Sequence, residues 1–231
     1  MISSGSGQAG SRPGCSGSRM RRRAWTLAVV MAAWVGASAF AAVEAELPAL
    51  VAAGDAASIR SLGPEVMPVL ARLYSQGDVD TRVRIAGLWY QLGWQSPAAR
   101  DALLADVHTE DETLRVQVQY ALSRVSSDDV VVDVLLANLQ HDDNPLFRDK
   151  AACSLATDQI HLTEAQKVRL FGKLIELLES PTGEVRSLAI RVLHTHTGQA
   201  KGFAPFLPPA HRQKAIERWR AWLDEYQANV L

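Results

Sequence analysis

The chain has 231 residues, of which 48% are hydrophobic and 21% are charged. This length is sufficient for a domain with a substantial core, and the composition excludes a chain that is disordered throughout. The formal net charge is −1, but five arginines and no acidic residue lie before position 42, so the rest carries 19 basic and 25 acidic groups, a net charge of −6. A surface of that sign repels phosphate backbones and argues against nucleic-acid binding.

Residues 1–41 have the composition of a leader. Residues 2–18 are rich in Gly and Ser, and three arginines, 21–23, then precede an apolar run over 24–37 that ends in small residues. This order predicts a secretory signal peptide. The apolar stretch 24–43 is also close to the ~20 residues that span a bilayer, so an uncleaved anchor is the alternative, although the small residues favour cleavage. A start at Met20 would give a signal peptide of ordinary length.

We therefore expect a periplasmic or extracellular protein, attached to a membrane only if the leader is kept. The two cysteines are Cys15, which would leave with the leader, and Cys153. With one cysteine left, the fold cannot depend on an intramolecular disulfide, even in an oxidising compartment. It must be stable through packing alone.

The mature part is predicted to consist of helices, because capping residues bracket segments with helical periodicity. Ser96 and Asn144 each precede a proline at the first helical position, and Thr163 with Gln166 fits a capping box. Residues 130–134 include four β-branched valines, which would suit a strand, but the position of this segment favours a helix. The expected helix pairs are a lead-in over 47–62, then 64–76 with 79–93, 96–108 with 111–126, 128–140 with 145–157 and 163–180 with 183–197, followed by a last helix over 209–227.

A helix opening recurs four times between residues 80 and 190. Each copy ends in an arginine (Arg84, Arg115, Arg148 and Arg186), and a small or compact residue follows three positions later. A leucine comes seven positions after the last three arginines and eight after the first. Self-similarity of this kind predicts stacked units, none of which buries its own apolar face alone.

The copies at 111–118 and 183–189 resemble the second helix of HEAT repeats, and the resemblance covers about residues 64–197. It implies an all-α fold, an α-solenoid of about four HEAT-like helix pairs with a concave binding surface. Residues 42–63 are then a short helical lead-in, and 198–231 a loop and C-terminal capping helix. In that helix Ile216, Trp219, Trp222, Leu223 and Tyr226 form an apolar stripe suited to cover the open end of the stack.

The repeated arginines are predicted to form a structural ladder, each bonding to an acidic or carbonyl group of the neighbouring unit. The alternative is a cationic groove for an acidic partner, which the planar guanidinium would suit. Asp80, Asp111 and Asp143 precede apolar-periodic runs and are interpreted as helix caps rather than catalytic carboxylates.

Other chemistry-bearing residues have structural interpretations. Cys153, among Ala151, Ala152 and Leu155, is predicted to be a buried filler, and His194 with His196 lie too poorly placed on a helix for chelation. Trp89 and Tyr90 are adjacent and point in different directions, so core packing is expected while partner contact stays open. No catalytic motif, metal ligand set or cofactor site is recognised.

The sequence thus predicts an exported, non-enzymatic helical-repeat protein that binds a protein or peptide, of undetermined oligomeric state. The alternative is an enzyme of HEAT-like type, as in the bilin lyases and alkylpurine DNA glycosylases. The negative charge opposes DNA binding. No residue suited to pigment chemistry is recognised.

Overall fold

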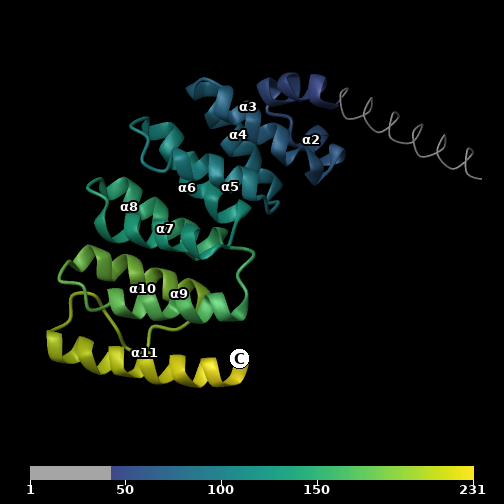
Figure 1. Ribbon diagram of the computed structural model, residues 1–231. Coiled ribbons are helices and arrows are strands. Elements are labelled where there is room, and N and C mark those ends of the chain that lie inside the picture. Colours follow the sequence, from purple (N-terminus) through teal and green to yellow (C-terminus); the bar gives the residue numbers. More distant parts are fainter. Residues whose placement is uncertain (1–42) are drawn as a thin grey trace, which may run out of the picture. The chain divides into compact units, whose positions relative to one another are not determined.

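The computed structural model describes residues 43–231, so the predicted leader at 1–41, with Met20 and Cys15, lies outside the described residues (Figure 1). The chain divides into two units, Met1–Ala45 and Glu46–Leu231. Residues 43–45, the described part of the first unit, are helical. In the second unit every regular element is helical, which confirms the predicted all-α class.

The second unit begins with two lead-in helices, residues 46–53 and α2 (Ala56–Leu62). Four contacting pairs follow, and α7 includes the valine-rich segment 130–134, as predicted. The pairs are α3 (Met67–Gln76, after the 3₁₀ turn η1, Pro64–Val66) with α4 (Val79–Leu92), α5 (Pro97–Ala105) with α6 (Glu112–Val125), α7 (Asp129–His141) with α8 (Pro145–Cys153), and α9 (Glu164–Leu177) with α10 (Gly183–Thr197).

Capping side chains set most of these helix starts. Ser96, Asn144 and the Thr163–Gln166 capping box act as predicted. Asp111 also caps its helix, since its Oδ1 accepts from the Leu114 amide at 2.8 Å. Three oxygen-bearing side chains and one reciprocal pair thus satisfy amides that have no partner inside the helix.

Two of the predicted caps are wrong. Asp78, not Asp80, caps α4, because Asp78 has extended backbone and its Oδ1 accepts from the Thr81 amide at 2.9 Å. Asp80 lies inside the first turn, past the N-cap position. Likewise Asn144, not Asp143, caps α8, through the Leu146 amide.

Successive pairs contact each other through equivalent helices. The second helices form the row α4, α6, α8 and α10, in which each contacts the next, and we call this the B row. Among the first helices, α3 contacts α5 and α7 contacts α9. Figure 1 shows the pairs in chain order, with α11 (Pro209–Val230) beside α9.

The helix α11 packs on α9 through part of the predicted stripe. Ile216 and Trp219 are buried, whereas Trp222, Leu223 and Tyr226 are half-buried. The Phe171 ring of α9 lies 5.7 Å from the rings of Trp222 and Tyr226, centroid to centroid. Among the described residues, no helix is both long and apolar enough to cross a bilayer.

The helix α8 continues into a π turn, η2 (Ser154–Asp158). The wider turn changes the direction of the side chains that follow it, and π turns occur often at functional sites. Its last residue, Asp158, is buried, and the following segment reaches α4, where His161 Nε2 lies 2.9 Å from the Gly93 carbonyl oxygen. This segment therefore joins the third pair to the first.

Candidate functional site

Three of the four predicted ladder arginines share one arrangement. Each donates to a backbone carbonyl of the loop before its own helix and to a group in the segment that follows its pair. Arg115 donates to the Val107 carbonyl at 3.3 Å and to Asp142, Arg148 to the Asp142 carbonyl at 2.5 Å and Glu184 at 2.7 Å, and Arg186 to the Ser180 carbonyl at 2.7 Å and the Pro205 carbonyl at 2.8 Å.

In the first pair this position belongs to Arg82, not to the predicted Arg84. Arg82 donates to the Gly77 carbonyl at 3.1 Å and pairs with Asp106 at 3.3 Å. Arg84 is exposed and donates to the Ala52 carbonyl at 2.6 Å. The four equivalent arginines therefore lie 33, 33 and 38 residues apart, and each follows its N-cap (Asp78, Asp111, Asn144 or Thr182) by four residues.

The same register describes the core. The residues three positions after these arginines and those seven positions after them are all fully buried. They are Ile85, Val118, Ala151 and Ala189 in the first set, and Trp89, Leu122, Leu155 and Leu193 in the second. Trp89 is thus a core residue in the place of a leucine, so it is excluded as a partner contact.

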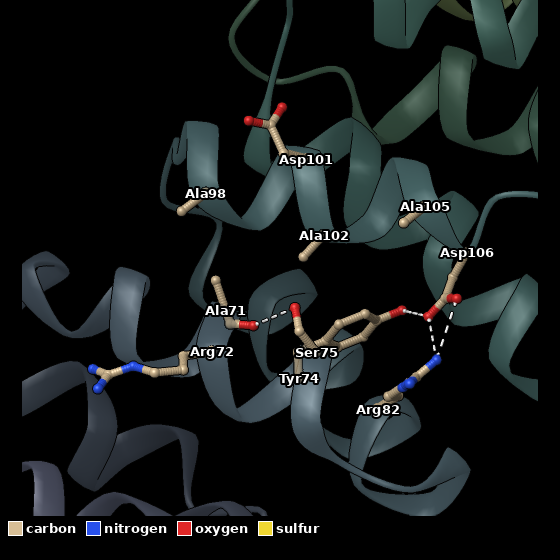
Figure 2. A pocket seen from close by; sticks show the side chains of 10 residues that line it. All are labelled: Ala71, Arg72, Tyr74, Ser75, Arg82, Ala98, Asp101, Ala102, Ala105 and Asp106. Carbon is tan, nitrogen blue, oxygen red and sulfur yellow. Dashed lines mark hydrogen bonds and ion pairs between the residues drawn. The ribbon is translucent and has the colours of Figure 1, made fainter.

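A pocket of about 600 Å³ lies at the Arg82 contact, between α3 and α5 (Figure 2). The Tyr74 hydroxyl donates to Asp106 at 2.7 Å, and burial together with that carboxylate raises the pKa of Tyr74. Four alanines line much of the rest. Because the central polar groups already pair with each other, we assign this pocket to the contact between helix pairs rather than to a ligand.

The side of the B row that faces away from the core, which we call the B-row surface, differs in composition from the ladder and from the core. Positions two, five and nine residues after each ladder arginine lie about 140–200° around the helix from it, so they face away from the core. Eleven of these twelve residues are exposed or half-buried, and Leu188 is the exception. They are Arg84, Gln117, Lys150 and Leu188; Gly87, Tyr120, Cys153 and Arg191; and Gln91, Arg124, Thr157 and Thr195.

A groove of about 660 Å³ opens on this surface between α4 and α6. Its lining includes Arg84, Tyr90, Gln91, Gln117 and Tyr120. We call it the B-row groove. Gly87 also lines it, and a Cβ placed there would meet Gln117 Oε1 at 3.8 Å and no other atom within 4 Å outside its own turn.

Aromatic and charged groups continue from one end of the groove. Tyr90 and Tyr120 lie 5.9 Å apart, centroid to centroid, and the Arg124 guanidinium lies 4.7 Å from the Tyr90 ring. Arg124 Nε is 3.4 Å from Asp158 Oδ1. Burial raises the pKa of Asp158, although Tyr90 and Arg124 oppose that shift. Tyr90, the second predicted partner contact, is half-buried and does reach this surface.

The row extends along α8 and α10. Lys150 Nζ lies 6.0 Å from the Tyr120 ring, and the Tyr120 hydroxyl raises the pKa of Lys150. Asp149 lies between cations, 3.7 Å from Lys150 and 2.7 Å from Arg191. Cys153 is half-exposed, 3.9 Å from Arg191 Nη2, so its prediction as a buried filler is wrong: it occupies a surface position of the register.

The two histidines near the end of α10, His194 and His196, lie in different environments. His196 Nε2 lies 2.8 Å from the Leu155 carbonyl oxygen and its ring meets Phe171 edge-on, whereas His194 is exposed. Within residues 43–231 no group of three or more His, Cys, Asp or Glu side chains is placed to hold a metal ion.

Searches of protein-family models, curated proteins and solved structures returned no match to this chain. The B-row surface is therefore the candidate binding site. Sequence reasoning singled out Arg84 and Tyr90 but missed Gln91, Gln117, Tyr120 and Lys150. The signal that finds them is their common position in the register that starts at Arg82.

Proposed function

We propose that this chain is an exported, non-enzymatic α-solenoid of HEAT-like helix pairs that binds a protein or peptide partner on its B-row surface. The observation that carries the proposal is the groove between α4 and α6. It combines tyrosines, a guanidinium and two carboxamides on adjoining helices. Tyrosine and arginine are over-represented among residues that dominate binding energy, and carboxamides both donate and accept hydrogen bonds.

The repeated contacts support the solenoid interpretation. Four arginines at equivalent positions bond forward to the next segment, and helices two apart in the chain contact along the B row. Units that stack in this way build a continuous surface from one helix of each pair. Two cations of the B-row surface pair with carboxylates (Arg124 with Asp158, Arg191 with Asp149), and groups held in such pairs fit binding rather than catalysis.

Photo-crosslinking inside cells tests this function directly. A benzophenone amino acid replaces Gln91, which is exposed in the groove, and in a control it replaces Gln140, which is exposed on α7 outside the B row. We expect a discrete adduct, identified by mass spectrometry, from position 91 and none from position 140. Adducts of equal yield from both positions, or none from position 91, would refute the proposal.

A further inference from the structure

We infer that the partner segment held in the B-row groove is an extended acidic peptide. This inference rests on the proposed function and specifies the chemistry of its ligand. Three features of the groove lead to it: the sign of its charge, the glycine in its lining, and the pair of carboxamides across it.

The charge of the B-row surface is opposite to that of the chain around it. The twelve register positions that form this surface hold four cations, Arg84, Arg124, Lys150 and Arg191, and no carboxylate. Residues 43–231 as a whole carry a formal charge of −6. The carboxylates in contact with these cations are Asp158, whose side chain is 4% exposed, and Asp149, whose side chain is 40% exposed, so the four cations outnumber them two to one. A cationic surface attracts an anionic segment through this opposite sign of charge.

Gly87 gives the groove its depth. A glycine inside a helix costs about 1 kcal/mol relative to alanine, and here packing does not require it, because a Cβ would have ordinary contact distance to Gln117. Glycine is expected where another backbone approaches a helix closely. The open floor beside Gly87 therefore fits a peptide backbone rather than a bulky ligand.

The polar groups around that floor match an extended chain. The Gln91 and Gln117 carboxamides are on adjoining helices, α4 and α6, and each can both donate to and accept from peptide groups. Arg84 lies on the α4 side of the groove, and Lys150 lies beyond Tyr120 on α8. Acidic side chains that alternate along a strand would meet these two cations while its backbone crosses Gly87.

The probes are three fluorescein-labelled octapeptides in which alanine alternates with glutamate, glutamine or lysine. Anisotropy titrations with the folded protein should give a dissociation constant below about 100 µM for the glutamate peptide, binding at least about tenfold weaker for the glutamine peptide, and none for the lysine peptide. Added salt should weaken the glutamate complex, since the attraction acts between partly exposed charges.

Variants locate the site. Lys150→Gln should weaken glutamate-peptide binding by about fivefold, and Lys173→Gln, which removes the same charge from an exposed position on α9, should leave it unchanged. Gly87→Leu fills the floor without a forbidden backbone angle and should abolish binding while circular dichroism stays unchanged. Equal affinity for the glutamate and glutamine peptides, equal effects at 150 and 173, or full binding by Gly87→Leu would overturn the inference. A crosslink from position 91 together with such a result would leave the binding function standing and exclude only the acidic peptide.

Discussion

The replacement Arg115→Met tests whether the ladder stabilises the stack. The Arg115 side chain is 16% exposed, and that of its partner Asp142 is 4% exposed. Its guanidinium also lies 4.0 Å from the Phe147 ring and donates to the Val107 carbonyl. Methionine keeps much of the apolar stem but removes every one of these polar contacts.

The expected cost follows from the partners left behind. Hydrogen bonds to charged groups contribute about 1.5–3 kcal/mol, a partly desolvated cation–π contact about 1 kcal/mol, and loss of one partner of a fully buried pair costs about 3–5 kcal/mol. Because Arg115 keeps some contact with water, we expect a loss of about 3 kcal/mol in the free energy of unfolding. Arg84→Met removes an exposed arginine that bonds to a single carbonyl and should cost no more than about 0.5 kcal/mol.

Urea titrations followed by far-UV circular dichroism measure both values, with the slope m compared to detect any loss of cooperativity. Asp142→Asn supplies the second arm of a double-mutant cycle, and the double variant should be less destabilised than the sum of the single ones. Equal costs for Arg115→Met and Arg84→Met would show that the two arginines have the same role, and the ladder that begins at Arg82 would then be wrong.

Three further predictions concern single positions. Gly87→Ala should raise the free energy of unfolding by about 0.5–1 kcal/mol and the melting temperature by about 1–4 °C, because the new methyl group has room and alanine favours the helix. A lower melting temperature would contradict the open space beside Gly87 in the B-row groove. Asp78→Ala should cost about 1 kcal/mol in urea unfolding and Asp80→Ala close to none, whereas the reverse order would restore Asp80 as the cap. Burial lowers the pKa of His196, so the unfolded chain binds the proton more tightly and the free energy of unfolding falls as pH drops below about 6.5. The stability of His196→Gln should therefore depend less on pH between about 7 and 5 than that of the wild type. Parallel stability curves would count against a buried neutral imidazole.

Helix starts were predictable from the sequence because capping is local. Ser96, Asn144 and Thr163 each act on amides within three residues of themselves, so their chemistry can be recognised without knowing the fold. The π turn after Cys153 and the contact of Asp158 with Arg124 depend on packing between distant segments. No local residue pattern distinguishes them, and they could not be predicted.

The register of the first pair could have been predicted and was missed. Asp80 and Arg84 have the same spacing as Asp78 and Arg82, so spacing alone does not distinguish the two pairs. The leucine distinguishes them, because it comes eight positions after Arg84 instead of seven. Counting from Arg82 places Trp89 at the seventh, where the other pairs have leucine, and the irregularity disappears.

The shift of two residues in the register also changes which arginine is assigned a structural role and which lies in the groove. Successive helical residues turn by about 100°, so Arg82 and Arg84 point about 160° apart. Arg82 faces the next helix pair and Asp106, whereas Arg84 faces the groove beside Gly87 and Gln117. With the wrong register the cation of the groove counts as a structural ladder member, and Gly87 counts as a small core residue. With the right register, Arg84 occupies the same position as Gln117 and Lys150 in the later pairs, and Gly87 the same position as Tyr120 and Cys153. The two interpretations of the repeated arginines, ladder and cationic groove, therefore do not compete, because they belong to different residues of the same helix.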